Sequence, residues 1–125
     1  MDLLIDTGIL IWILDNSSNL TINSKQIIQA ADKRLISSIS IVEIEIKRSI
    51  GKLIIPDTYL QKIFESGFEE LPFDFSDAYF LGKLPFFHKD HFDRMLISHA
   101  IVKGLTLLTN DKTFKKYNLP IILNE

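Results

Sequence analysis

One stretch of the chain, residues 88–111, constrains the fold most strongly. It reads HKDHFDRMLISHAIVKGLTLLTND. After Phe92 the apolar residues recur at the three-to-four residue step of a helix, and Gly104 ends that pattern. The apolar run from Leu105 to Leu108 follows at once and is bounded by an Asn-Asp pair, which is typical of a strand buried on both faces of a parallel sheet. The stretch therefore predicts a helix that leads directly into a buried parallel strand.

The exception in this helix is Asp93, an acid on its apolar face. Counted in helical steps, Asp93 shares a stripe with Ile97, Ala100 and Ile101, which we expect to point inward. A buried carboxylate needs a partner that offsets its desolvation. Asp93 is therefore a candidate functional residue.

Glu43 repeats this anomaly in the segment from Ser40 to Ile50. The segment is ambiguous between strand and helix, but Ile39, Ile46 and Ile50 share one helical stripe, which favours a helix. Ser40, followed three residues later by Glu43, matches the capping-box pattern of a helix start. Glu43 nevertheless falls on the apolar stripe, at a slot where an apolar residue is expected.

The rest of the chain alternates short apolar runs with helical patterns. We expect further strands at residues 3–5, 34–38, 69–73 and 121–123, and further helices at 7–14, 23–31, 57–66 and 76–84, with a short one after Asp111. This alternation predicts an α/β sandwich with a mainly parallel sheet. The 125 residues, 46% of them hydrophobic, are expected to form a single domain, 1–125.

Four acids are placed where such a sheet carries its sites, at the carboxyl ends of the strands. Asp6 ends the first strand, Glu43 enters the helix after the second, and Asp111 follows the strand at 105–108, while Asp93 lies in the helix before it. If these strands are neighbours, the carboxylates converge and repel one another unless protons or a cation relieve the repulsion. Oxygen ligands suit Mg²⁺ or Mn²⁺, which can polarise a phosphodiester and activate the attacking water.

Each acid also has a purely structural interpretation. Asp6 and Asp111 are candidates for helix caps, Glu43 for a capping box, and Asp93 for a favourable charge at a helix N-terminus. Caps do not explain why Glu43 and Asp93 occupy apolar stripes. The coincidence of all four favours a site.

Composition excludes several classes of protein and of metal site. The chain has no cysteine, which excludes disulfides and thiolate metal sites and is compatible with a reducing cytoplasm. No apolar run approaches the roughly 20 residues of a membrane helix, so we expect no membrane partner. A net charge of -2 argues against broad electrostatic binding of nucleic acid, although local basic clusters remain available.

Four motifs together resemble a known family. They are LLIDT near the start, SIVEIEIKRSIGKL after the second strand, the 88–111 stretch, and a closing F-x-x-Y from Phe114 to Tyr117. In this order they resemble the PIN domain, specifically the VapC-type toxin ribonucleases of bacterial toxin–antitoxin pairs. The resemblance implies a PIN-like α/β/α sandwich with a central, mainly parallel sheet. It also implies acidic metal ligands at Asp6, Glu43, Asp93 and Asp111, of which Asp111 can act through water.

The resemblance further implies an endoribonuclease that depends on Mg²⁺ or Mn²⁺, acts on RNA in the cytoplasm, forms a homodimer and is inhibited by a small antitoxin protein. The family usually has Pro where this chain has His91, a position that suits a helix start. One alternative is a PIN-like module that binds RNA or protein without cleaving. Another is a phosphoryl-accepting receiver domain, which would require a lysine where Thr109 ends the late strand.

Secondary residues carry weaker expectations. Thr7 and Thr109 are candidates to orient ligand carboxylates, and Arg94 is expected in a salt bridge more than on a phosphate. His88 and His91 are expected in solvent on a turn, and His99 packed against its helix.

Seven of the nine phenylalanines lie between residues 64 and 87. They exceed what the helices of this segment need for packing. Part of them, with Phe64, Phe80, Phe86 and Phe87 as candidates, is expected to form a homodimer contact or an antitoxin groove.

Overall fold

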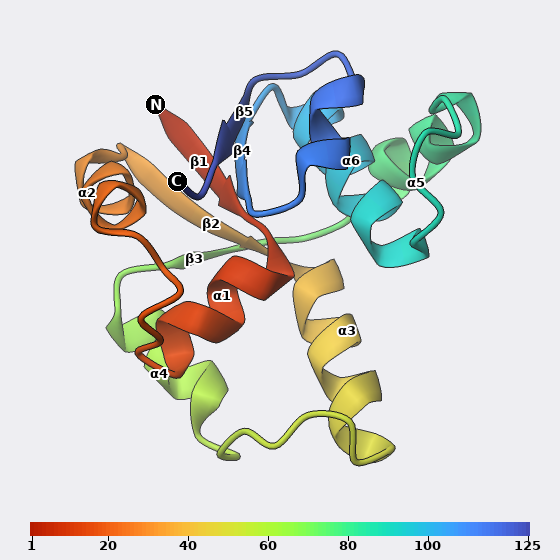
Figure 1. The fold of residues 1–125 in the computed structure, drawn as a ribbon. Coiled ribbons are helices and arrows are strands. Elements are labelled where there is room, and N and C mark those ends of the chain that lie inside the picture. The colour runs from red at the N-terminus through yellow and green to blue at the C-terminus, as the bar shows by residue number, and fades with distance from the viewer.

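A central sheet of five parallel strands organises the computed structural model, which describes residues 1–125 (Figure 1). The strand order is β3-β2-β1-β4-β5. The strands are β1 (Asp2–Ile5), β2 (Lys33–Ser37), β3 (Glu69–Leu71), β4 (Thr106–Thr109) and β5 (Ile121–Leu123). The helices are α1 (Thr7–Leu14), α2 (Ile22–Ala30), α3 (Ser38–Ser49), α4 (Tyr59–Glu65), α5 (Phe75–Phe80) and α6 (His91–Lys103), with 3-10 turns η1 (Leu81–Lys83) and η2 (Lys112–Lys116). The predicted parallel α/β architecture is confirmed.

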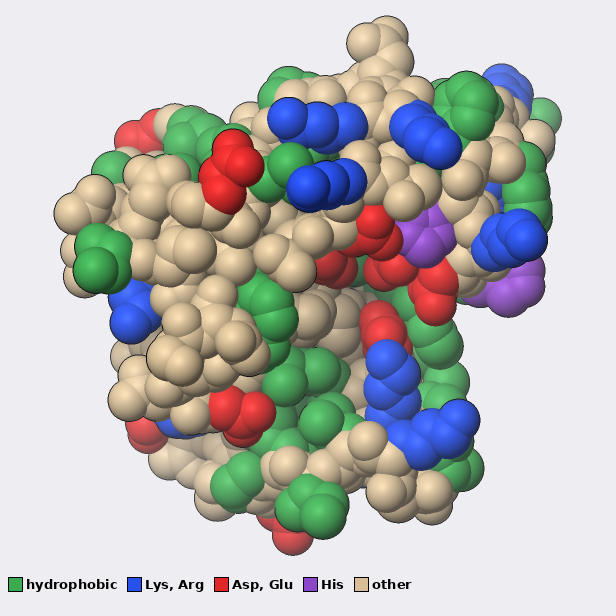
Figure 2. All heavy atoms as spheres, in the orientation of Figure 1, with side chains coloured by type: hydrophobic (Ala, Val, Ile, Leu, Met, Phe, Trp, Pro, Cys, Tyr) green, Lys and Arg blue, Asp and Glu red, His purple; other side chains and the backbone are tan.

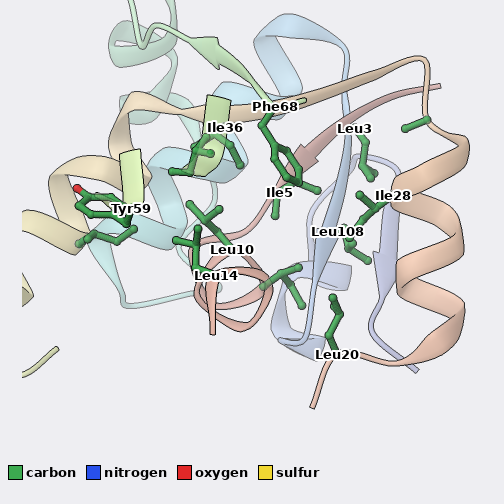
Figure 3. Packing of buried hydrophobic residues seen from close by; sticks show 14 of the residues in the cluster. Leu3, Ile5, Leu10, Leu14, Leu20, Ile28, Ile36, Tyr59, Phe68 and Leu108 are labelled. Atoms are coloured by element: carbon green, nitrogen blue, oxygen red, sulfur yellow. The ribbon is translucent and has the colours of Figure 1, made fainter. Parts of the chain in front are cut away.

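The two faces of the sheet carry separate hydrophobic clusters because side chains alternate along each strand. On one face, Leu3 and Ile5 of β1 pack with residues of α1, α2 and α4, as Figure 3 shows around Leu10, Ile28 and Tyr59. On the other face, Leu4 packs with α6, η2 and the segment before α6. Burial on both faces explains why the central strands β1 and β4 contain continuous apolar runs.

Helix α3 starts earlier than the sequence pattern suggests, and the predicted capping box is wrong. Ser37 caps the helix by accepting the backbone N–H of Ile39 at 3.0 Å, so Ser40 lies inside the first turn. The inward face of α3 therefore carries Ser40, Glu43 and Ile44. The predicted inward stripe is wrong at its far end, because Ile46 and Ile50 are exposed where α3 projects beyond the sheet (Figure 1).

Helix α6 follows its prediction closely. It begins at His91, is capped by Asp90, whose side chain accepts the N–H of Asp93 at 2.9 Å, and ends at Gly104 in the left-handed conformation (φ 67°). Ile97 and Ala100 are fully buried, so the stripe that starts at Asp93 does face inward. No helix of the structure has the length and apolarity needed to cross a membrane.

Candidate functional site

The topology of the sheet brings the four predicted acids together. β1 is the central strand. The strands that follow it are added first on one side (β2, β3) and then on the other (β4, β5), so the strand order reverses at β1. Such switch points form crevices at the carboxyl ends of parallel strands. Here an open hollow of about 510 Å³ is lined by Asp6, Glu43, Asp93 and Asp111, and we call it the acidic hollow. Figure 2 shows red acidic side chains gathered in a depression of this face, beside a purple histidine.

Asp6 and Asp111 are connected through Thr109. The Thr109 hydroxyl donates to Asp6 Oδ2 at 2.6 Å and accepts the backbone N–H of Asp111 at 3.0 Å. Asp6 is only 8% exposed, and this burial raises the pKa of its carboxyl to about 6, against the opposing hydrogen bond from Thr109. The expectation that Thr109 contacts a site carboxylate is confirmed.

Among the four predicted acids, the carboxyl of Asp93 has the largest pKa shift. Partial burial, followed by the negative charges of Asp6, Asp90, Glu43 and Asp111, raises the pKa of the Asp93 carboxyl to about 8. Such a shift is typical of carboxylates that share one site without enough positive charge.

Glu43 is buried with one oxygen paired and the other free. Its Oε2 lies 2.6 Å from Lys47 Nζ, one helical turn further along α3, while its Oε1 has no hydrogen-bond partner. Lys47 also lines the acidic hollow. Lys47 was not among the predicted site residues, although its spacing of four residues from Glu43 is the signal of a helical ion pair.

His88 also belongs to the site, and its predicted position in solvent is wrong. Its side chain is 13% exposed, and Nε2 lies 2.7 Å from Asp111 Oδ2 and 3.1 Å from Asp93 Oδ2. Burial raises the pKa of Asp111, but the hydrogen bonds from His88 and Thr113 outweigh it and lower that pKa overall. One atom each of His88, Asp93 and Asp111 lies within 4.8 Å of the others, a spacing that suits a bound cation.

The donor set fits a hard divalent cation. The hollow offers carboxylate oxygens from the four predicted acids, including the unpartnered Oε1 of buried Glu43, and Asp90 lines it as well. Oxygen-rich sites of this kind favour Mg²⁺ or Mn²⁺. A cation would offset the burial and, secondarily, the mutual repulsion that raise the pKa values of Asp6 and Asp93.

Several secondary residues lie elsewhere. The Thr7 hydroxyl donates to Ser40 at 2.8 Å and so contacts no acid. Both roles considered for Arg94 are wrong, because it is buried, donates to the carbonyl oxygens of Leu84 and Pro85, and stacks on Phe86. His91 is exposed as expected.

His99 is fully buried, as expected, but it lies in a polar cluster. Its Nδ1 is 2.9 Å from Ser37 Oγ, and its Nε2 is 3.4 Å from Asp77 Oδ2. This cluster lies away from the acidic hollow, so His99 is not a candidate ligand.

The aromatic segment is divided between core and surface. Phe64, Phe86 and Phe87 are at least half exposed, and Phe80 packs against the core. The most exposed aromatic residues are Phe75 (95%) and Tyr79 (76%), both on α5, which the sequence analysis did not single out.

Comparison with known proteins places this geometry in a family. A PIN domain profile matches residues 3–119. Among solved structures, the chain is similar to one in the DNA-bound VapBC2 complex of Rickettsia felis, with a TM-score of 0.77, 22% identity and 100% of each chain covered. It is also similar to a chain of DNA-bound VapBC from Salmonella typhimurium (TM-score 0.70, 22% identity, 98% of each chain) and of FitAcB from Neisseria gonorrhoeae (0.68, 17%, 96% of each).

No match is found among curated protein sequences. The structural likenesses are below 25% identity and show a shared fold. The profile, by contrast, covers both the β1 end with Asp6 and the α6–β4 stretch with Asp93 and Asp111. The chain therefore belongs to the PIN domain family.

Proposed function

We propose that this chain is an endoribonuclease dependent on Mg²⁺ or Mn²⁺ and the toxin of a toxin–antitoxin pair, built as one PIN domain over residues 1–125. The observation that carries the proposal is the gathering of Asp6, Glu43, Asp93 and Asp111 in one open hollow. Lys47 is the one cation paired with any of these acids, apart from the titratable His88. A site with this excess of negative charge is suited to a divalent cation.

Each side chain has a separable role in this proposal. Asp6, Glu43 and Asp93 would hold the cation, and Asp111 would support it as a further ligand or through water. When bound, the cation stabilises negative charge on the phosphoryl oxygens and activates the attacking water. Lys47 and Lys112 line the same hollow and are suited to contact the flanking phosphates of a nucleic acid.

Replacement of Asp93 by Asn tests this assignment. Asp93→Asn keeps the side-chain volume but removes a ligand charge, so RNA cleavage in Mn²⁺ should fall by at least about 100-fold, as when a group that stabilises the transition state is lost. Asp15→Asn is the matched control, because Asp15 is exposed at the end of α1, away from the hollow. Asp93→Asn protein that cleaves RNA at the wild-type rate would favour the non-catalytic, RNA- or protein-binding alternative.

We propose a small antitoxin as the protein partner. The similar structures from Rickettsia felis and Salmonella typhimurium are VapBC complexes. In this chain, Ile46, Ile50 and Ile54 are exposed on the far half of α3 and the loop after it, and Phe64 on α4 lines a neighbouring apolar groove. Figure 2 shows hydrophobic side chains along the depression that leads to the acidic side chains. A partner that covers this surface would also block the hollow.

Homodimer formation is a separate proposal and rests on α5. Phe75 and Tyr79 are one helical turn apart and both largely exposed. The Phe75→Ser, Tyr79→Ser double variant should be monomeric in sedimentation experiments in which the wild type is a dimer. A wild-type chain that is monomeric at high concentration would contradict the dimer.

A further inference from the structure

We propose that His88 is a positioning residue of the acidic hollow: its Nε2–H holds Asp111 in place beside Asp93, and the imidazole is not itself a ligand. The inference deepens the proposed function, because it concerns the geometry of the same site. It also separates His88 from the acids with which it forms a metal-like cluster.

The hydrogen bonds of the His88 ring determine its tautomer. His88 Nδ1 accepts the backbone N–H of Asp90 at 3.1 Å, so its lone pair is in use and it carries no proton. A neutral imidazole has a single N–H, which must then be on Nε2. A protonated ring would place a donor on both nitrogens and would be incompatible with the N–H of Asp90. The contact to Asp111 at 2.7 Å is therefore donated by Nε2–H.

The second step is that this tautomer cannot ligate a cation. A metal-bound imidazole nitrogen needs a free lone pair. Nε2 has a proton in that position, and the lone pair of Nδ1 is directed to Asp90. Of the three groups within 4.8 Å, only the two carboxylates remain as ligands.

The third step is that the ring is held rigidly from several sides. The hydroxyl of Tyr117 accepts the backbone N–H groups of Phe87 and His88 at 3.0 and 2.9 Å. The imidazole packs edge-on against Phe114, with ring centroids 5.6 Å apart. Phe114 and Tyr117 come from the closing F-x-x-Y motif, which thus supports the site without lining the hollow.

The fourth step is the effect on the carboxylates. Asp111 has both oxygens held, Oδ2 by His88 and Oδ1 by the backbone N–H of Thr113 at 2.9 Å. Nε2 also lies 3.1 Å from Asp93 Oδ2, so the ring stands next to both carboxylates while it donates to Asp111. Hydrogen bonds of this kind orient ligands and tune a metal site from outside.

The test measures binding of Mn²⁺ alone, by calorimetry, to three variants. His88→Ala should weaken the affinity for Mn²⁺ by about 10-fold to 100-fold, the range found when such supporting partners are removed. His88→Gln, which retains an N–H donor at a similar reach, should recover most of that loss. His91→Ala is the matched control: His91 is exposed three residues away, and its removal should leave the affinity unchanged.

Two spectroscopic measurements on the wild type separate positioning from ligation and from a merely structural role. Nitrogen NMR should show His88 as the Nε2–H tautomer, and pulsed EPR of bound Mn²⁺ should show no directly coordinated imidazole nitrogen. A coordinated nitrogen would overturn the inference in favour of a ligand. Equal Mn²⁺ affinity in the wild type and His88→Ala would overturn it in favour of a role in the turn alone.

These outcomes are distinct from failure of the ribonuclease assignment. A wild type that binds Mn²⁺ with the expected His88 dependence but cleaves no RNA contradicts only the ribonuclease. A wild type that binds no Mn²⁺ contradicts both proposals. If His88→Ala does not fold, the His88→Gln affinity and the wild-type spectra still decide.

Discussion

Helix α6 joins two acidic clusters that differ in how far the fold offsets their negative charge. At its first turn Asp93 faces Asp6, Glu43 and Asp111, and the pKa of Asp93 is raised to about 8. At its last turn Lys103 binds Asp74 at 2.6 Å and lies 3.6 Å from Asp77. The hydrogen bond from Lys103, with that from the N–H of Asp77, lowers the pKa of Asp74 to about 2.

In the second cluster, Lys103 and the start of α5 supply most of the partners of the acids. Asp74 and Asp77 form a reciprocal capping box at the start of α5, and Asp77 is fully buried. His99 lies next to Asp77 and contacts Ser37 at the end of β2, so the cluster connects α5, α6 and the sheet. Burial lowers the pKa of His99 despite the nearby charge of Asp77.

Buried acids therefore do not by themselves identify a functional site. What distinguishes the acidic hollow is that its negative charges exceed the positive charges the fold provides, and that it is open to solvent. The Asp77 cluster is closed to solvent, and Lys103 contacts both of its acids, although Asp77 Oδ1 and His99 Nε2 have no hydrogen-bond partner.

The largest effect should come from removing the centre of the structural cluster. Asp77→Ala should lower the free energy of unfolding by about 3 kcal/mol or more, because His99 and Lys103 lose a buried partner and the backbone N–H of Asp74 loses its acceptor in the capping box. Urea unfolding followed by circular dichroism measures this loss. Asp77→Asn, which keeps an acceptor for the N–H of Asp74, should lose less, and equal stability of Asp77→Ala and wild type would remove the distinction between the clusters.

The corresponding change in the acidic hollow should have the opposite sign. Without metal at pH 7, Asp93→Asn should be more stable than the wild type by roughly 1 kcal/mol or more, because folding forces the wild type to keep the Asp93 carboxyl protonated far above its ordinary pKa. At about 4 °C per kcal/mol for a domain of this size, the melting temperature should rise by several degrees. Millimolar Mn²⁺ should stabilise the wild type and not the variant. A wild-type melting curve that ignores both Mn²⁺ and chelator would contradict the metal site.

The pH dependence of the free energy of unfolding should also differ between the metal-free wild type and Asp93→Asn. Asp6 and Asp93 have folded-state pKa values of about 6 and about 8, above the ordinary 3.8. Their protonation in the folded state contributes stability that is fully present below about pH 4 and is lost as pH rises through 6 to 8. Metal-free wild type should therefore lose stability over this range relative to Asp93→Asn. Taking the difference between the two proteins cancels the opposing contribution of His99, and parallel curves in chelator would disprove the shift at Asp93.

The smallest expected effect is on Mn²⁺ affinity, and it distinguishes Lys47 in the acidic hollow from Lys103 in the Asp77 cluster. Lys47 competes with a cation for Glu43, so Lys47→Met should increase Mn²⁺ affinity by about fivefold, the factor that roughly 1 kcal/mol between exposed charges represents. Lys103→Met should leave Mn²⁺ affinity unchanged and lower thermal stability slightly. A calorimetric titration of both variants makes the comparison, and weaker Mn²⁺ binding by Lys47→Met would show that Lys47 supports the site instead of competing for it.

The amino-acid sequence by itself determined the order of the elements, the parallel sheet and the positions of the four acids. Strands buried on both faces need continuous apolar runs, and this signal is local. Asp6 and Asp111 follow such runs directly, and Asp93 interrupts a stripe that the structure does bury. Each of these features can be recognised within a few residues of the chain.

Tertiary structure alone decided which partners these residues have. The start of α3 depends on Ser37 capping it from the end of β2, and its far half is exposed because nothing in the chain covers it. His88 lies on an irregular segment without periodicity, and it enters the site only because Tyr117 and Phe114, nearly thirty residues later, hold its backbone and ring. Arg94 turns from the acids to backbone carbonyls for a similar reason. The periodicity of apolar residues in the sequence indicates which side chains are buried. Which hydrogen-bond partner each polar side chain finds depends on residues distant in the sequence, and these come together only when the chain has folded.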